Sequence, residues 1–183
     1  DWTFAQLGAS GPLQLRGVDG QSGVSFGIRL DQVVMRARLK LRFTYSPAML
    51  QDLSHLKLVL NNEVIDTIPL PKDKAGKEIE YALDIDPRYF TDFNHLDIHL
   101  IGHYTMECED TMHSSLWASI SNRSSLELSL RELGLQDDLS LLPAPFFDRR
   151  DNRRLELPFV FAGAPGKDVL QAAGVLASWF GAQ

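Results

Sequence analysis

The residues with the richest chemistry form one run, residues 102–117, which directly follows an alternating β-strand pattern. The run reads GHYTMECEDTMHSSLW and contains acids, imidazoles, hydroxyls, a thiol and an indole. Polar and aromatic side chains at the end of a strand build a surface rather than a core. Aromatic rings supply contact area, and carboxylates accept hydrogen bonds from hydroxyl groups. The run therefore predicts a contact surface for a sugar or for a protein partner.

Other chemistry in this run has less support. Carboxylate, thiolate and imidazole groups are metal ligands, but the run lacks the CxxC and HExxH spacings of metal sites. A nucleophilic Cys108 would need a thiolate, which the neighbouring acids disfavour. As the single cysteine of the chain, Cys108 has no partner here for a disulfide, so cysteine usage leaves the compartment open. A loop whose acids cap turns, with Trp117 in the core, stays open as an alternative.

Three histidines recur on one side of the preceding strand pattern. His95, His99 and His103 are spaced by four residues, which is roughly 13 Å along a strand. They cannot share one ion, so we expect a solvated face. Nor does any pair of acids stand out as the two carboxylates that glycoside hydrolysis requires.

A basic run contains the RxxxR spacing that PilZ domains use for cyclic di-GMP. Its four arginines are Arg149, Arg150, Arg153 and Arg154. Paired guanidinium groups suit phosphates. However, the companion D/N-x-S-x-x-G motif is missing, and Asp148 and Asp151 offer internal partners. The four arginines are candidates for nucleotide binding, but a solvated linker or a contact with the neighbouring domain is the preferred interpretation.

The composition is that of a folded domain. The chain has 183 residues, 44% of them hydrophobic and 23% charged, and a net charge of -6. The acidic balance argues against a nucleic-acid partner. No apolar run approaches the roughly 20 residues that span a bilayer, and no signal peptide opens the chain. The first residues instead read as the interior of a longer protein.

The strongest structural signal is an alternation over residues 33–45. Apolar residues occupy the odd positions from Val33 to Tyr45, and Arg36, Arg38 and Lys40 lie between them. A period of two with one apolar face predicts a long half-buried strand. We therefore expect the odd positions to be buried and the basic ones to be exposed.

Shorter patterns of the same kind fill the first 135 residues. They lie at residues 13–18, 24–30, 56–60, 64–70, 78–85, 95–103 and 124–133. Asn61 and Asn62 can adopt the positive φ that a tight hairpin needs. Short strands at this spacing with almost no helix predict a β-sandwich, and a jelly roll is the first choice for residues 1–135.

The pattern changes after Leu135. Residues 136–154 contain Pro143, Pro145 and many charges, which is typical of a linker. Residues 155–162 predict a buried strand, and residues 167–180 a helix that Gly181 ends. Strand, loop and helix form the start of an α/β domain. One such unit cannot bury both of its faces, so we expect residues 155–183 to be the truncated start of that domain.

The chain resembles the BcsB family, a periplasmic component of bacterial cellulose synthase whose members often carry the name cyclic-di-GMP-binding protein. The blocks that carry the resemblance are GHYTMECEDTMHSSLWASISNRSSLEL, PAPFFDRRD, LPFVFAGAP, LQAAGVLASWFG and the hairpin LNNEVIDTIPL. The resemblance runs over residues 26–181. It implies a jelly roll similar to carbohydrate-binding modules, followed by a flavodoxin-like α/β domain, with both units repeated in the full protein.

The resemblance also implies a function. A family member works in the periplasm beside the catalytic cellulose synthase subunit and is held at the inner membrane by a C-terminal anchor outside this sequence. It is not an enzyme, needs no cofactor, and guides nascent β-1,4-glucan. Contacts to the glucan would come from Trp117, Tyr104, Asp110 and His113. The alternative is an assembly module that contacts copies of itself or the synthase without binding sugar.

Overall fold

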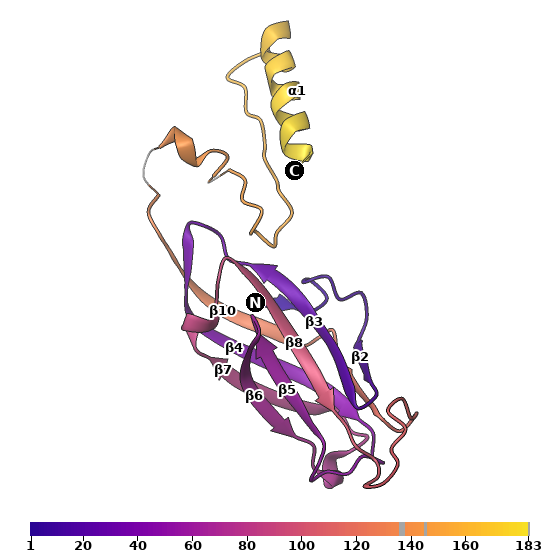
Figure 1. Ribbon diagram of the computed structural model, residues 1–183. Helices are drawn as coiled ribbons and strands as arrows, with labels where there is room; N and C mark the ends of the chain where they lie inside the picture. The colour runs from indigo at the N-terminus through magenta and orange to yellow at the C-terminus, as the bar shows by residue number, and fades with distance from the viewer. Residues whose placement is uncertain (136–137, 145, 183) are drawn as a thin grey trace.

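The computed structural model describes residues 1–135, 138–144 and 146–182. Figure 1 shows an elongated β-sandwich with the C-terminal residues standing at one of its ends. Sheet A contains β1 (Trp2–Thr3), β2 (Leu13–Arg16), β4 (Gln32–Tyr45), β7 (Ile79–Ile85), β9 (Trp117–Ile120) and β10 (Ser125–Glu132). Sheet B contains β3 (Asp19–Gly27), β5 (His55–Leu60), β6 (Glu63–Pro69) and β8 (Phe93–Ile101). The prediction of a mainly β, two-sheet sandwich is confirmed.

Strands that are distant in the sequence pair within each sheet. Sheet A has the order β1-β10-β4-β9-β2 with β7 on the other side of β4, and sheet B has the order β3-β8-β5-β6. All of these pairs are antiparallel. The described residues also contain three short 3-10 helices in connections, Lys72–Lys74, Pro87–Tyr89 and Leu139–Leu141.

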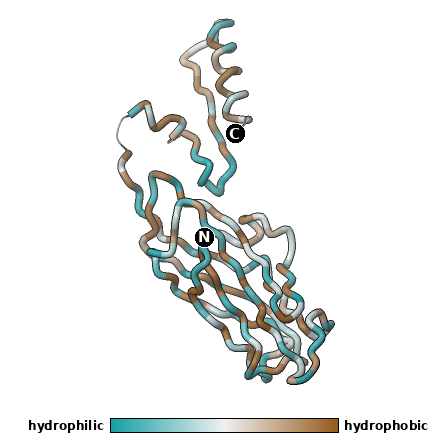
Figure 2. The backbone as a smooth tube through the Cα atoms, viewed as in Figure 1, coloured by the Kyte–Doolittle hydropathy of each residue, from teal (hydrophilic) through white to brown (hydrophobic). Residues whose placement is uncertain are grey.

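One apolar core lies between the two sheets. Alternate residues of β4, β5 and β8 point into it, and Leu41, Leu58 and Ile98 are fully buried. Figure 2 shows this alternation as hydrophobic and hydrophilic colours that change along the strands. Burying this apolar area stabilises the fold by roughly 25 cal/mol per Å².

The expected burial of β4 is right from Ala37 to Tyr45 and wrong at its start. Val33 is only half-buried and Met35 is 47% exposed, whereas Val34 is buried. The cause is a β-bulge: Ser129 pairs with Arg36, but Leu130 pairs with Val34, so Met35 is an extra residue. An extra residue in one strand reverses which side chains face the core.

The predicted hairpin turn is confirmed, since Asn61 and Asn62 have φ of 53° and 69° between β5 and β6. Two short strands, β1 and β9, had no counterpart in the sequence patterns. With two and four residues, they are too short to show a period.

The predicted helix is confirmed as α1 (Lys167–Gly181). The predicted strand over residues 155–162 is wrong, because this stretch has no regular structure and most of it is exposed. A strand needs a neighbour to accept its hydrogen bonds, and the described residues pair no strand with it. Of the predicted linker, residues 136, 137 and 145 lie outside the described residues, and its boundaries stay a prediction.

The helix is amphipathic but has no buried residue. Val169, Leu176 and Trp179 are among its exposed apolar side chains, and Phe180 packs against Phe147 with ring centroids 6.1 Å apart. Figure 1 shows α1 standing beyond the sandwich. Within residues 1–135, 138–144 and 146–182, no helix is both long and apolar enough to cross a bilayer.

The bulge gives a matched test of the core. We expect Leu41→Asp to lower the free energy of unfolding by about 4 kcal/mol, because it buries an unpaired charge. Met35→Asp changes an odd position of the same strand but places the charge in solvent, so it should cost about 0.5 kcal/mol or less. Urea denaturation followed by tryptophan fluorescence measures both. Equal losses for the two variants would contradict the bulge.

Candidate functional site

The loop over residues 102–116, which carries the polar and aromatic residues, connects β8 of sheet B to β9 of sheet A. It lies at the end of the sandwich opposite to α1 (Figure 1). Its base is fixed to the β2–β3 turn: the Gly17 N–H donates to the Leu116 carbonyl, and the Val18 N–H donates to the Thr111 carbonyl, both at 3.0 Å. The loop is therefore a structured surface on a rigid scaffold.

Three of the four glucan-contact candidates come together in this loop. The Tyr104 and His113 rings stack with centroids 4.2 Å apart and planes 16° apart. The Asp110 N–H donates to the Tyr104 hydroxyl at 3.0 Å, and the Asp110 carboxylate accepts from the Met112 N–H at 3.1 Å. Tyr104 packs against the core and is half-buried, as is His113, whereas Asp110 is exposed.

Glu109 organises this loop, although the sequence did not single it out. One of its carboxylate oxygens accepts from the Tyr104 N–H at 2.8 Å, and the other pairs with His103 Nδ1 at 2.7 Å. The hydrogen bond from Tyr104, and then the pairing with His103, lower the pKa of Glu109 below its usual value. The loop thus contains both a structural acid and an exposed one.

Trp117 is the fourth candidate, and it faces a different direction. It opens β9 opposite Arg16 of β2, and its neighbour Ala118 is fully buried. Because side chains alternate along a strand, the half-buried indole lies on the outer face of sheet A, outside the core. Trp117 thus lies at the same end of the sandwich as the loop but does not belong to the Tyr104–His113 stack.

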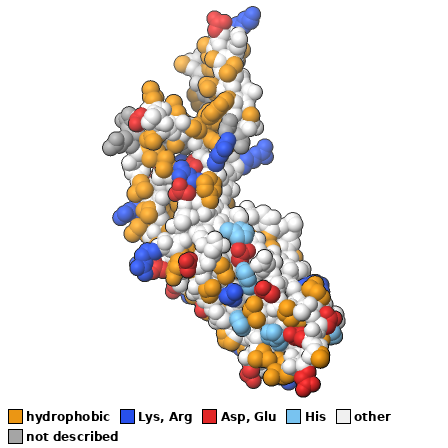
Figure 3. Space-filling view, in the orientation of Figure 1, with side chains coloured by type: hydrophobic (Ala, Val, Ile, Leu, Met, Phe, Trp, Pro, Cys, Tyr) orange, Lys and Arg blue, Asp and Glu red, His pale blue; other side chains and the backbone are white. Residues whose placement is uncertain are grey.

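The expectation that three histidines share one strand face is corrected. His95 and His99 lie on β8, but the strand ends at Ile101, so His103 belongs to the loop and pairs with Glu109. Figure 3 shows histidine side chains gathered on the visible face of the sandwich. Within the described part of the chain, no group of three or more His, Cys, Asp or Glu side chains could hold a metal ion.

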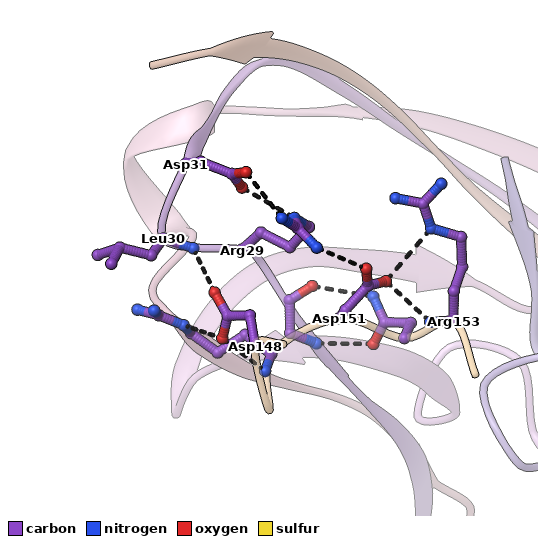
Figure 4. A network of polar contacts seen from close by, with 9 residues as sticks. Arg29, Leu30, Asp31, Asp148, Asp151 and Arg153 are labelled. Carbon is purple, nitrogen blue, oxygen red and sulfur yellow. Dashed lines mark hydrogen bonds and ion pairs between the residues drawn. The ribbon is translucent and has the colours of Figure 1, made fainter. Parts of the chain in front are cut away.

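The arginine run lies beside the edge of the sandwich. Residues 148–152, called the docking segment from here on, contact the end of β3 and the start of the β3–β4 turn (Figure 4). The Asn152 side chain accepts from the Gly27 N–H at 2.8 Å and donates to the Gly27 carbonyl at 2.9 Å. A Cβ at Gly27 would lie 2.2 Å from the Arg150 carbonyl oxygen, so only glycine permits this approach.

Charged groups complete the docking. The Asp148 carboxylate accepts from the Leu30 N–H at 2.7 Å and from Arg150 Nε at 2.8 Å. Arg29 pairs with both Asp31 and Asp151, at 2.7 and 2.9 Å. Asp148, Arg150, Asp151 and Asn152 therefore contact the sandwich, as one of the two interpretations expected, whereas Arg149, Arg153 and Arg154 are exposed.

The docking changes what the four arginines can do. Arg150 pairs with Asp148 and Asp92, and Arg153 pairs with Asp151. Arg149 lines a groove on the sandwich, and Arg154 is exposed. Arg150 is held within the contact, whereas Arg149 and Arg153, which have the RxxxR spacing, are both exposed, so nucleotide binding by these arginines stays a prediction.

A two-sheet sandwich that carries its polar and aromatic residues on end loops is the architecture of a binding module. The sequence matches the family model for cellulose synthase BcsB, first CBM domain, over residues 1–132. It also matches the model for the first FD domain of the same protein over residues 138–183. The chain belongs to the cellulose synthase BcsB family.

Curated relatives agree with this assignment. The chain is 51% identical over 179 residues to a cyclic di-GMP-binding protein of Xanthomonas axonopodis pv. citri, covering 98% of this chain and 23% of the relative. It is 50% identical to one of Pseudomonas fluorescens, covering 98% and 24%. A putative cellulose synthase 2 of Komagataeibacter xylinus is 37% identical over 181 residues, or 98% of this chain and 12% of the relative. The chain thus spans about a quarter of the length of the first two.

Among solved structures, a family 35 carbohydrate-binding module from an environmental isolate aligns with a TM-score of 0.37 and 11% identity. The alignment covers 67% of this chain and 76% of that one. This similarity is too low to support an argument.

The docking segment should depend on pH. Burial opposes ionisation of Asp148 and Asp151, but hydrogen bonds from Arg150, Leu30, Arg153 and Arg29 outweigh it and lower the pKa of both carboxyl groups. A lowered pKa stabilises the folded form above the unfolded value of about 3.9, and this contribution is lost as the pH falls through the folded value. We expect docking to be complete from pH 8 to 5 and to weaken progressively as the pH falls below about 4, towards the lowered pKa of the two carboxyl groups.

Hydrogen exchange of the Gly27 and Leu30 amides measures the docking. Asp148→Asn should expose both amides at pH 7. Asp84→Asn is the control, since Asp84 pairs with Arg38 in an exposed position on sheet A. Unchanged protection of both amides in Asp148→Asn at pH 7 would contradict the role of this carboxylate.

Proposed function

We propose that this chain is a non-catalytic part of a periplasmic subunit that contacts nascent β-1,4-glucan beside the cellulose synthase. The observation that carries the proposal is the arrangement of Tyr104, His113 and Trp117 at one end of the sandwich, within a chain of the BcsB family. The relatives named cyclic di-GMP-binding protein and putative cellulose synthase support a role in the same system.

The loop suits contact with a moving polymer. Its base is fixed by hydrogen bonds to Gly17 and Val18, so little conformational entropy is lost on binding. The His113 ring and the Asp110 carboxylate offer one apolar face and one acceptor. Such a small surface supports binding on the order of millimolar, about 4 kcal/mol, which lets a polymer slide.

Catalysis has no support from the acids of this loop. Glu109 is bound to Tyr104 and His103, and Asp110 accepts from the Met112 N–H. Glycoside hydrolysis needs two carboxyl groups facing each other across a bond, one of them protonated. An ionised Glu109 with a lowered pKa is unsuited to the acid role.

The wider setting is part of the same proposal. We place the subunit at the inner membrane through a C-terminal anchor outside this sequence, with the catalytic synthase subunit and nascent cellulose as its partners and no nucleic acid. Activation by cyclic di-GMP, as the relatives' names suggest, would be a property of the whole complex. Arg150 and Arg153 serve the docking described above.

One observation favours a second function, an assembly module that contacts the synthase or copies of itself. Met106 and Met112, both in the loop, are 79% and 70% exposed. Flexible, polarizable methionine side chains suit protein interfaces. In that case the loop would bind a protein surface, and the Tyr104–His113 stack would only hold the loop in shape.

Titration with cellohexaose separates the two functions. We expect amide NMR shifts over residues 104–117 that saturate in the millimolar range. Trp117→Ala should weaken binding about tenfold, because the indole supplies most of the apolar contact area. Val64→Ala, an exposed apolar change on β6, is the matched control and should leave the affinity unchanged. No shift in this loop at saturating sugar would favour the assembly module.

A further inference from the structure

A groove with a different composition lies on the outer face of sheet B, beside the docking segment. Its volume is about 760 Å³, within the roughly 300–1,000 Å³ range of ligand sites. Strands β3 and β8, the β5–β6 turn and the docking segment form its walls. Its lining residues include Ser25, Asn62, Phe93, His95, Asp97 and Arg149. We call it the Phe93 groove.

Phe93 gives the groove an open aromatic face. It is the first residue of β8 and is 65% exposed. The next inward-facing residues, Asn94 and Leu96, are buried, so Phe93 lies on the outer face together with His95 and Asp97. The exposed ring supplies the groove with an apolar contact face.

A chain of polar contacts fixes the imidazole next to Phe93. Ser25 Oγ lies 2.8 Å from His95 Nδ1, and Asp97 Oδ1 lies 2.9 Å from His95 Nε2. Ser25 and His95 are direct cross-strand partners of β3 and β8. Because both ring nitrogens are engaged, the imidazole is held in one orientation before any ligand arrives.

Gly23 makes room for this chain. It lies opposite Asp97 in the β3–β8 pairing, and a Cβ there would lie 2.7 Å from Asp97 Oδ1. A larger residue would displace the carboxylate that holds His95. The lack of a side chain at Gly23 on the neighbouring strand β3 therefore lets the Asp97 carboxylate keep its position beside His95.

The opposite wall is equally rigid. The Asn61 side chain donates to the Tyr89 carbonyl and to Asn94 Oδ1, both at 2.9 Å, and accepts from the His95 N–H. These bonds hold the turn that presents exposed Asn62 to the groove. An amide at this position can both donate to and accept from a hydroxyl group.

The charge of the lining selects the class of ligand. One carboxylate, Asp97, and one guanidinium, Arg149, face the groove, so it has no strong field of either sign. An anion such as a nucleotide would need several cations without a carboxylate among them. An aromatic face bordered by fixed hydroxyl, imidazole and amide groups instead matches a neutral sugar ring, which has apolar C–H faces and an equator of hydroxyl groups.

We infer that the Phe93 groove is a second binding site for a neutral polysaccharide, separate from the loop over residues 102–117. The identity of the polysaccharide as β-glucan rests on the proposed function. Strand β8 runs from the groove to the loop, and its nine residues span roughly 30 Å. One extended polymer along this strand could contact both sites, which would raise its affinity through effective concentration.

The test uses cellohexaose and the 183-residue chain, followed by amide NMR and isothermal titration. We expect shifts at Phe93, His95 and Asn62, and an affinity for this site about tenfold weaker in Phe93→Ala. Phe93 is exposed, so the variant should fold like the parent. Val64→Ala is again the matched control, because Val64 is 53% exposed but does not line the groove. His95→Ala should weaken the same site without changing shifts over residues 104–117.

The outcomes distinguish the two sites. Groove shifts that survive Trp117→Ala and disappear in Phe93→Ala support the inference, even if the loop shows no binding. Shifts confined to residues 104–117 overturn the inference and leave the proposed function intact. Unchanged groove shifts in Phe93→Ala, or stronger groove shifts with cyclic di-GMP than with cellohexaose, also overturn it.

Discussion

The contact between Asn152 and Gly27 is the constraint on which the arrangement of this chain depends. A side-chain amide takes the place of a backbone partner at the edge of β3 and satisfies both the N–H and the carbonyl of Gly27. The buried Asp148 carboxylate is stable beside it only because Leu30 and Arg150 donate to it. Removing one member of such a paired set leaves a buried charge without a partner, which costs far more than the pair itself contributes.

Two features follow from this contact. The chain leaves the sandwich at a fixed place, so the residues that lead to α1 start in a defined direction (Figure 1). One wall of the Phe93 groove, which includes Arg149 and Asn152, comes from the docked residues. The groove would therefore lose this wall if residues 148–152 were released.

The sandwich separates its two candidate surfaces by the length of one strand. The loop over residues 102–116 follows the last residue of β8, and Phe93 is its first. The loop is tied to the core through Leu116 and Tyr104, and Phe93 lies on the outer face of a strand whose inward residues are buried. This division matches the general rule that function sits on loops and faces while packing fixes their position.

The sequence predicted those parts of the fold that repeat. The alternation in β4 and β8 and the Asn61-Asn62 turn contain enough residues to reveal a period or a turn type. The bulge at Met35 could not be predicted in this way, because it depends on how β10 pairs with β4. The strand expected at residues 155–162 has the right composition, but composition supplies no neighbouring strand.

The candidate site was predicted in part. The run that contains Tyr104, Asp110 and His113 was visible because polar residues follow a strand, and Trp117 was visible as an indole. Its orientation on sheet A depends on the short strand β9, which has no sequence signature. The link between Ser25 and His95 joins residues 70 positions apart, as a cross-strand pair. Such pairs follow from topology, which a single sequence does not specify.

The edges of sheet B have a consequence for how copies of the sandwich could meet. On one side, Asn152 occupies the Gly27 backbone groups at the end of β3. On the other, β6 has an extra residue at Ile65, since Leu58 pairs with Asp66 and Val59 with Val64. A bulge twists an edge strand away from flat pairing, and an occupied edge offers fewer free groups. The sheet is thereby protected against growing from one molecule into the next, so copies crowded along a polymer could lie side by side without aggregating through these strands.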